Sequence, residues 1–337
     1  MQDRFSDRYV APGAAHVAPA GDGPTMSVTF VLVPNFTMLA FSSALEPFRI
    51  ANQLAGRRLF RWAVFGRSDE AVMSSSGIAV STDGSLPREV TDGYVLVCGG
   101  VTPEKTMSRE LGNWLRAQWR RGRVIGGLCT GTYALAHAGI LSGHHFTLHW
   151  ENIPGFCEKF PDLEPERRIF CMDDRILSCA GGVAAADLSL ALIAQHYGAP
   201  FARVVMEMCL LSNNRSGEEA QVSSLAARLA SRNAVVVRAA EFLEANLEDG
   251  FDLAACARHA GVAPRQVQRL FRSYLGMTPR QYANDLRLAH GRMLLAGTNL
   301  PVLDVAIACG YATRSAFSKG FRLKYGCAPQ HFTNFRG

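Results

Sequence analysis

The chain has 337 residues, which is long for one domain and sufficient for two domains with separate cores. Its residues are 48% hydrophobic and 19% charged, and no apolar run approaches the roughly 20 residues that span a bilayer, so we expect no membrane segment. The net charge of +6 arises in residues 233–337, with 13 Lys and Arg against 7 Asp and Glu, because residues 1–232 hold 22 of each. This distribution predicts a polyanion partner for the last third.

Residues 1–25 mix charges with Pro, Gly and Ala and lack the apolar core of a secretory signal. We therefore expect a disordered tail on a cytoplasmic protein. Nine cysteines occur without a CxxC pair, which favours neither a disulfide framework nor a zinc site. No metal or other cofactor is expected.

Strand and helix patterns alternate over residues 26–211. Residues 27–34 (SVTFVLVP) predict a strand, and the helical spacing that follows ends at Gly56. Further strands are predicted at 59–68, at 93–100 and in RVIGGL from Arg123, with a helix at about 107–121 and a strand pair meeting at Asp173 and Asp174. This order predicts an α/β domain with a flavodoxin-like parallel sheet covered by helices on both faces.

The strand RVIGGL runs through two glycines into Cys129 and then into an Ala- and Leu-rich helical segment. This arrangement presents a nucleophile at the top of a parallel sheet, and a helix N-terminus stabilises a thiolate. Cys129 is thus a candidate reactive residue. Catalysis would also require a base or an orienting group within hydrogen-bond reach.

Open α/β sheets bind ligands at the carboxyl ends of their strands. The candidate ligand-binding residues there are Glu46, Gly99, Gly100, Cys129, Thr130, His149 and Trp150. The elbow amides suit a carboxylate, whereas Glu46 and Trp150 suit a cationic nitrogen, so we expect a small cationic metabolite with a carboxylate. In the alternative interpretation Glu46 is a helix-surface carboxylate, His149 satisfies a backbone partner and Trp150 belongs to the core.

Residues 212–232 are polar and predict a linker, after which residues 233–337 show helical spacing and an internal repeat. The two copies are ARHAGVAPRQVQRLFRSYLGMTPRQY and AIACGYATRSAFSKGFRLKYGCAPQHF. Gly261 matches Gly310 at an offset of 49, and Phe271 matches Phe321 at an offset of 50. One supersecondary unit is therefore used twice.

In each copy a short helix, a glycine turn and a second helix predict a helix-turn-helix, whose second helix enters the major groove. The candidate DNA-binding residues are Arg265, Gln266, Gln268, Arg269, Arg272, Thr313, Arg314, Ser315, Ser318, Lys319 and Arg322. Arg and Gln can form paired hydrogen bonds to guanine and adenine, whereas Arg272, Arg322 and Lys324 suit phosphate contacts. The alternative is the solvated face of a small helical bundle.

The phrase DVAIACGYATRSAFSKGFRLKYGCAPQHF resembles the AraC/XylS family of transcriptional regulators. The resemblance implies an all-α domain with two helix-turn-helix subdomains, bridged by a helix at about residues 281–296. These subdomains would read successive major-groove segments on one face of double-stranded DNA. RNA polymerase and a second copy of the chain are the further partners expected.

The first 210 residues resemble the PfpI-type, glutamine-amidotransferase-like fold, and the whole chain resembles the GlxA-type branch of AraC regulators. The phrases LAFSSALEPFRIANQLAG, LHWENIPGFCEKFP and CAGGVAAADLSLALI carry this resemblance. They are similar to regulators of arginine, carnitine and glycine-betaine catabolism. The resemblance implies a ligand-responsive activator of a catabolic operon, with one of these metabolites or a related one as effector.

Two departures bear on catalysis. Thr130 follows Cys129 where PfpI-type proteases carry histidine, and Ala40 stands where the Cys-Thr hydrolases and hydratases of the superfamily carry aspartate. Glu46 alone persists from that acidic motif. We therefore expect a regulator without turnover. The rival hypotheses are a cysteine-dependent amidohydrolase or hydratase with a DNA-binding appendage, and a thiol redox sensor.

Overall fold

The computed structural model describes residues 10, 13–19, 23–90, 92–213, 215–221, 225–229, 231 and 233–334. Most of the predicted tail lies outside these residues. The chain divides into two compact units, Met1–Ile153 with Phe160–Gln221, and Pro154–Lys159 with Val222–Gly337. Residues 212, 213 and 215–221 of the predicted linker therefore belong to the first unit. No helix of the described chain is long and apolar enough to cross a membrane.

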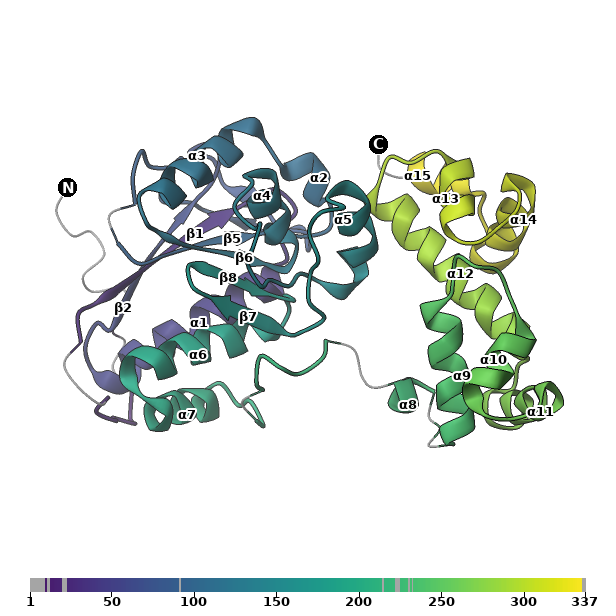
Figure 1. Cartoon of the computed structure of the whole chain (residues 1–337). Coiled ribbons are helices and arrows are strands. Elements are labelled where there is room, and N and C mark those ends of the chain that lie inside the picture. Colours follow the sequence, from purple (N-terminus) through teal and green to yellow (C-terminus); the bar gives the residue numbers. More distant parts are fainter. Residues whose placement is uncertain are drawn as a thin grey trace. The chain divides into compact units, whose positions relative to one another are not determined.

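The first unit is built on a six-stranded sheet in the order β2-β1-β5-β6-β8-β7 (Figure 1). The strands are β1 (Met26–Leu32), β2 (Phe60–Phe65), β5 (Tyr94–Cys98), β6 (Val124–Leu128), β7 (Phe170–Asp173) and β8 (Ile176–Cys179). All neighbours are parallel except β7 and β8, which form the predicted antiparallel pair. A small hairpin of β3 (Val72–Met73) and β4 (Ala79–Val80) stands apart from the sheet, and the sequence analysis did not predict it.

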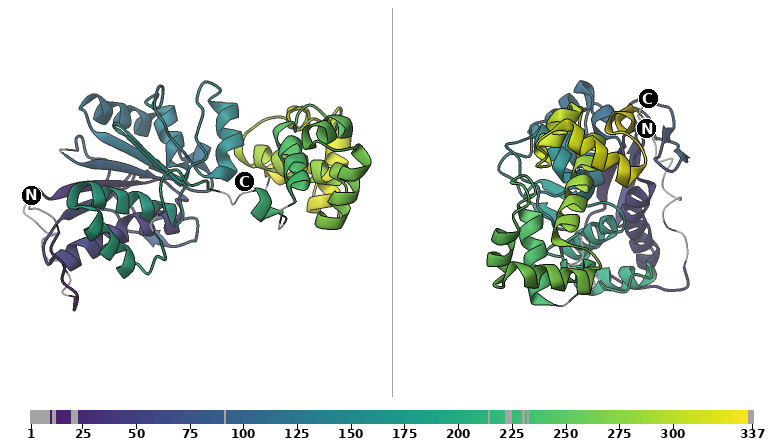
Figure 2. Two further views of the ribbon diagram at one scale, coloured as in Figure 1. Left: turned by 60° about the horizontal axis from the view of Figure 1, so that its bottom comes forward. Right: turned by 90° about the vertical axis from the view of Figure 1, so that its right-hand side faces the viewer.

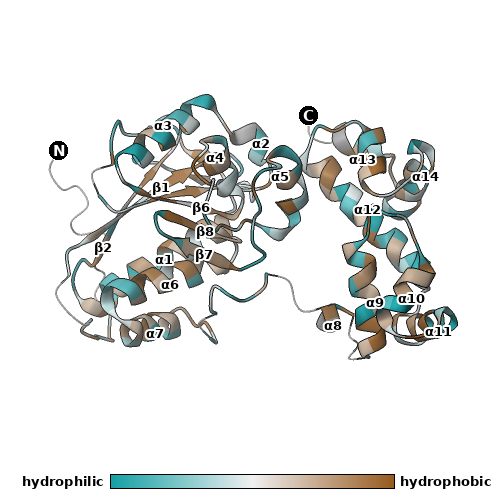
Figure 3. Cartoon of the chain, viewed as in Figure 1, coloured by the Kyte–Doolittle hydropathy of each residue, from teal (hydrophilic) through white to brown (hydrophobic). Residues whose placement is uncertain are grey.

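Helices cover both faces of this sheet, as expected. The helices are α1 (Met38–Ala55), α2 (Pro103–Thr106), α3 (Arg109–Arg120), α4 (Thr132–His137), α6 (Ala184–Tyr197) and α7 (Ala199–Met208). The first, α1, packs with α6 and α7 on one side, while α3 and α4 pack with β6 on the other (Figure 2). The inner strands are apolar along their length (Figure 3) because both of their faces are buried.

A buried amide joins α1 to β2. Asn52 is completely buried, and its Oδ1 accepts hydrogen bonds from the backbone N–H groups of Leu59 and Phe60, each at 2.8 Å. Its Nδ2 donates to the carbonyl oxygen of Phe60, also at 2.8 Å. The side chain thus satisfies three backbone groups where the chain enters the sheet.

The second unit consists of helices. They are α5 (Ile153–Lys159, from Pro154 onward), α8 (Leu225–Arg228), α9 (Ala234–Ala245), α10 (Leu253–Ala260), α11 (Pro264–Leu275), α12 (Pro279–Gly297), α13 (Val302–Ala308), α14 (Arg314–Tyr325) and α15 (Pro329–Asn334). The helix pairs α10 with α11 and α13 with α14 are the two predicted copies. Their turn glycines, Gly261 and Gly310, have nearly equal φ angles of 73° and 70°, so the repeat extends to backbone conformation.

Two separate hydrophobic cores lie under the two copies. One contains Val267 and Phe271 of α11, and the other contains Phe317 and Phe321 of α14. The bridging helix α12 contributes Ala283 to the first core, and Leu288, Leu294 and Leu295 to the second. This helix corresponds to the one expected at about residues 281–296.

The buried amide provides a test of the α1–β2 junction. Replacing Asn52 by Ala leaves two buried backbone N–H groups and one carbonyl without their partner. We expect the free energy of unfolding of the first unit to fall by about 2 to 4 kcal/mol. Chemical denaturation followed by circular dichroism measures this change. Gln53→Ala, at the neighbouring partly exposed position, serves as the control and should change stability by less than about 1 kcal/mol. Equal stability of both variants would contradict the role given to Asn52.

Candidate functional site

Cys129 lies in a sharp turn between β6 and α4, as the elbow motif predicts. Its φ angle of 58° is in the left-handed region, which costs a residue with a side chain about 1 to 3 kcal/mol. Close packing holds the turn: a Cβ on Gly131 would stand 1.9 Å from the carbonyl oxygen of Val97, and one on Gly181 would stand 2.6 Å from the Cβ of Cys129. The elbow is therefore fixed by β5 below it and by the loop after β8.

The thiol of Cys129 is buried, with 6% of the residue exposed. Burial raises the pKa of the thiol, while hydrogen bonds with Thr37 and with the backbone of Thr130 oppose that shift and the charge of Glu151 adds to it. The Thr37 hydroxyl lies 3.7 Å from Sγ. The expectation that the helix N-terminus yields a thiolate is thus not supported, because desolvation outweighs the favourable hydrogen bonds.

The two glycines after β5 make backbone contacts. A Cβ on Gly99 would stand 2.2 Å from the backbone nitrogen of Gly131, and one on Gly100 would stand 1.8 Å from the carbonyl oxygen of Asn35. The hydroxyl of buried Thr130 donates to the carbonyl oxygen of Gly100 at 2.6 Å. These residues lie around the elbow, as expected. Both positions require glycine because another backbone segment of the same unit packs directly against them.

Glu46 is placed differently from its expected position beside the elbow. It lies on α1, where its Oε2 is 2.6 Å from Nε of Arg49, and its side chain is 47% exposed. Burial raises the pKa of Cys209, just after α7, and the charge of Glu46 adds to this shift. Among the described residues, the side-chain hydrogen-bond partner of the Cys129 thiol is Thr37. The helix-surface interpretation of Glu46 therefore fits the structure better.

The carboxylate near the elbow belongs to Glu151, which the sequence analysis did not single out. It lies in the 3-10 turn η2 (Trp150–Asn152), and its charge acts on both the Cys129 thiol and the His149 imidazole. Burial lowers the pKa of His149, which keeps the ring neutral at pH 7, and Glu151 partly offsets this shift. Trp150 is 47% exposed, so it is not a core residue.

Thr37 was also missed. It occupies the N-cap position of α1, but its hydroxyl contacts Cys129 and makes no capping hydrogen bond. A threonine between the end of a strand and a helical pattern is ordinarily assigned as a cap. The interaction depends on two segments 92 residues apart, which local patterns do not reveal.

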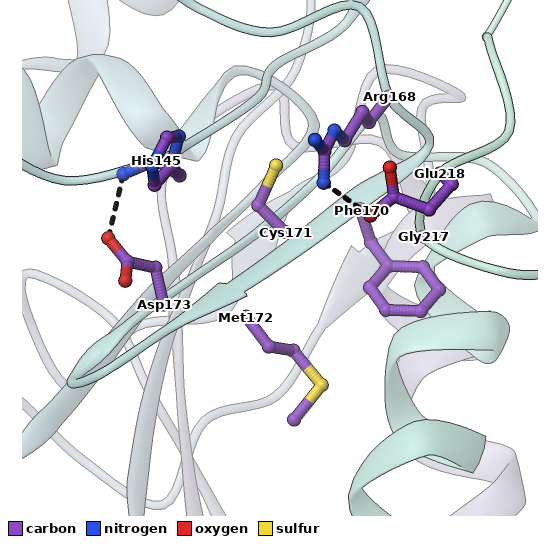
Figure 4. Close-up of a pocket in the computed structure, with 8 residues that line it drawn as sticks. All are labelled: His145, Arg168, Phe170, Cys171, Met172, Asp173, Gly217 and Glu218. Atoms are coloured by element: carbon purple, nitrogen blue, oxygen red, sulfur yellow. Dashed lines mark hydrogen bonds and ion pairs between the residues drawn. The ribbon is translucent and has the colours of Figure 1, made fainter.

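A cavity of about 330 Å³ lies beside β7 (Figure 4), and none of the residues predicted for a ligand lines it. It is lined by His145, Arg168, Phe170, Cys171, Met172, Asp173, Gly217 and Glu218. Its charged groups are already paired: Arg168 contacts Glu218 at 2.5 Å, and Asp173 accepts a hydrogen bond from the backbone of His145 at 2.7 Å. Burial raises the pKa of Cys171 to about 12. This cavity offers little free charge to an ionic ligand.

Among the described residues, no group of three His, Cys, Asp or Glu side chains is placed to hold a metal ion.

In the second unit, α11 presents basic and amide groups to solvent. Arg265, Gln266, Arg269 and Arg272 are exposed, and Gln268 is half-buried, while Val267 and Phe271 on the opposite side fill the core. Within the described chain the five polar side chains make no hydrogen bond or ion pair. An uncompensated row of this kind is available to a polyanion.

The second copy presents a smaller set on α14. Arg314, Ser315, Lys319 and Arg322 are exposed, and Ser318 is half-buried. The hydroxyl of Thr313 accepts a hydrogen bond from Ala316 N at 3.2 Å and thereby caps the helix. Lys324, considered for phosphate contact, instead forms an ion pair with Asp285 of α12 at 2.9 Å.

An α/β unit with a cysteine elbow, followed by a duplicated helix-turn-helix unit, defines a class of transcriptional regulators that carry their own candidate sensor. Residues 26–195 match the DJ-1/PfpI family, and residues 256–334 match a helix-turn-helix domain family. The HTH-type transcriptional regulator GbdR of Pseudomonas aeruginosa is 35% identical over 95% of this chain and 86% of its own length. The HTH-type transcriptional regulator GlxA of Rhizobium meliloti is 35% identical over 90% of this chain and 94% of its own.

Solved structures agree with these relatives. An AraC family transcriptional regulator from Pseudomonas putida is 26% identical, with a TM-score of 0.50, over 55% of this chain and 99% of that one. The chain belongs to the AraC family of HTH-type transcriptional regulators, in the group with a DJ-1/PfpI domain. The predicted fold class, the resemblance and the DNA-binding regulatory function are thereby confirmed.

The raised pKa of Cys129 predicts slow alkylation. Because the thiol stays protonated at pH 8, we expect iodoacetamide to modify it at least about tenfold more slowly than the half-buried Cys327. The rate should rise only as the pH approaches the raised pKa. Peptide mass spectrometry after timed labelling between pH 6 and pH 10 measures both rates. Fast modification of Cys129 below pH 7 would show a thiolate and contradict this assignment.

Proposed function

We propose that the first unit is an effector-binding domain without catalytic turnover, and that it controls DNA binding by the second unit. The observation that carries the proposal is the turn η2, which follows His149: Trp150 is 47% exposed, and the charge of exposed Glu151 acts on the buried Cys129 thiol and on His149. An indole face and a carboxylate together suit a cationic nitrogen. The proposed effector is therefore a small cationic metabolite that also carries a carboxylate, such as carnitine, a betaine or arginine.

Several features favour binding over catalysis. A cysteine nucleophile needs a general base, and the side chain hydrogen-bonded to the Cys129 thiol is the Thr37 hydroxyl. Glu46, the acidic residue retained from the hydrolase motif, is paired with Arg49. The relatives that match most of this chain are named as transcriptional regulators. These observations support a site that recognises a ligand and releases it unchanged.

Thiol redox sensing is less well supported than effector binding. Cys98, Cys129 and Cys179 lie close enough to influence one another at the ends of β5, β6 and β8, but all three are buried. Desolvation raises the pKa of each thiol, to about 12 for Cys179. Redox-sensing cysteines are accessible and have low pKa values, whereas these three are buried and have raised pKa values.

For the second unit we propose that α11 and α14 each enter a major groove. The exposed, unpaired Arg265 and Arg269 suit base edges, whereas Arg272 and Arg322 near the helix ends suit phosphates. We further propose that the protein is cytoplasmic and acts as a homodimeric activator that contacts RNA polymerase. Two copies would present four reading helices to a repeated operator.

The effector site is tested by comparing two carboxylates. We expect Glu151→Gln to weaken binding of the effector about tenfold or more, because it removes the charge beside Trp150. Glu46→Gln is the matched control and should bind within about twofold of the parent protein. Thermal-shift titrations with carnitine, glycine betaine and arginine identify the ligand and measure its affinity. The opposite ranking of the two variants would restore Glu46 as the recognising carboxylate.

Cys129→Ala separates regulation from catalysis in the same assays. Effector-dependent DNA binding should persist in this variant. Neither the parent protein nor Cys129→Ala should hydrolyse amides or hydrate isocyanides. Turnover by the parent that disappears in Cys129→Ala would establish the enzyme hypothesis instead.

Base reading by α11 is tested on an operator selected from random DNA. We expect Arg265→Ala or Arg269→Ala to cost about 1 to 3 kcal/mol of binding free energy and to relax the preference at one base pair. Arg272→Ala or Arg322→Ala should weaken binding to all sequences and reduce the salt dependence by about one counterion. Fluorescence anisotropy on selected and scrambled duplexes measures both effects. The exposed Arg258 of α10 provides the control substitution to Ala, and a uniform loss for Arg265→Ala would reassign that residue to phosphate contact.

A further inference from the structure

The segment before the second unit pairs with the first unit through an isolated antiparallel bridge. Ile169 N donates to the carbonyl oxygen of Glu219 at 2.9 Å, and Gln221 N donates to that of Arg167 at 3.0 Å. Between them Arg168 and Ala220 form an antiparallel bridge. These bonds cover the chain that leads into β7, the edge strand of the sheet. The polar composition of this segment had suggested a free linker.

Two further contacts hold this segment against the sheet. Gly217 packs so closely on β7 that a Cβ there would stand 2.9 Å from the carbonyl oxygen of Phe170, and both residues line the cavity in Figure 4. At the other end, Arg215 donates to the buried carboxylate of Asp187 on α6 at 2.6 and 3.1 Å. A buried carboxylate requires such a partner, so the start of the segment is firmly anchored.

Gln221 is the last residue of the segment, and its side-chain amide makes four hydrogen-bond contacts. Its Nε2 lies 2.8 Å from both Thr147 Oγ1 and the Leu148 carbonyl oxygen, and 2.9 Å from the Arg168 carbonyl oxygen. Its Oε1 accepts a hydrogen bond from Trp150 N at 2.8 Å. Only an amide, with donors on one side and an acceptor on the other, satisfies this arrangement.

Gln221 therefore joins the proposed effector loop to the boundary between the two units. The amide holds the backbone of Trp150, whose indole is part of the proposed site. The first unit ends at Gln221, and Val222 begins the second. The chain also passes from the first unit to the second after Ile153, three residues beyond Trp150. The side chain of the last residue of the first unit thus binds the backbone three residues before another crossing.

We propose that Gln221 is a positioning residue that transmits occupancy of the effector site to the DNA-binding unit, a role that rests on the proposed effector site. Movement of Trp150 toward a ligand changes the hydrogen bond from its backbone N–H to the Gln221 amide. The segment from residue 215 to 221 then shifts, and this shift is the signal that reaches the DNA-binding unit. Coupling of this kind requires the effector to bind more tightly when the segment has shifted than when it has not, or the reverse.

Two variants perturb the segment from different ends. Gln221→Glu preserves the shape of the side chain but removes the Nε2 amide donor, which the oxygen atoms of Thr147, Leu148 and Arg168 share. Gly217→Ala lifts the segment from β7 without touching the loop at residues 147–152. The control is Glu219→Gln, on the same segment, because the Glu219 side chain is exposed and, among the described residues, accepts its hydrogen bond from the backbone of Ser216 at 3.3 Å.

Hydrogen–deuterium exchange of the peptide covering residues 147–152 tests the connection without any effector. We expect exchange about tenfold faster in Gln221→Glu and a severalfold increase in Gly217→Ala, with no change in Glu219→Gln. Unchanged exchange in Gly217→Ala would show that the segment and the loop are independent, and would overturn the proposal. Gly217→Ala also keeps the test available if Gln221→Glu does not fold.

The regulatory role is tested with carnitine, glycine betaine and arginine. In thermal-shift measurements, we expect each compound that binds the parent protein to bind Gln221→Glu as well. In this variant, however, the compound should no longer change the affinity for the operator. A full response in this variant would overturn the proposal. If none of the compounds binds the parent, the proposed effector class fails, and the exchange experiment still decides whether Gln221 couples the segment to the loop.

Discussion

The whole candidate site depends on one strained backbone position. Cys129 carries a side chain in a left-handed conformation, and it is held there because β5 and the loop after β8 leave no other space. The same close packing sets the direction in which α4 leaves the sheet and brings Thr37 to the thiol. A turn kept under strain in the interior of a protein needs rigid surroundings. Here those surroundings bury the thiol, and this burial raises its pKa.

Much of the fold could be predicted from the sequence because its signals are local and repetitive. The apolar runs of β1, β5 and β6, the antiparallel pair β7 and β8, and both helix-turn-helix copies follow from periodicity and turn residues. The outward faces of α11 and α14 follow from the same periodicity, since the buried positions fix the exposed ones. Local signals say less about how distant segments meet.

The candidate site illustrates that limit. Thr37 has the pattern of an ordinary helix cap, and Glu151 is one of several acidic residues in a polar loop. Glu46 has a motif in its favour, yet its position on α1 directs it toward Arg49. Gln221 lies in a stretch whose composition suggests a linker, but three of the four hydrogen-bond partners of its side chain are backbone groups far away in the sequence. A polar side chain that hydrogen-bonds to backbone groups far away in the sequence produces no periodic pattern in the sequence around it.

The bridging helix α12 has a mechanical consequence for the DNA that this protein can recognise. Its 19 residues are continuous, and its two ends belong to different hydrophobic cores. The distance and the phase between α11 and α14, the two proposed reading helices, are therefore set by a continuous helix about 28 Å long. One residue inserted into that helix would rotate one reader against the other by about 100°. For the proposed binding by α11 and α14, we therefore expect an operator that tolerates changes of base more readily than a change in the number of base pairs between its two sites.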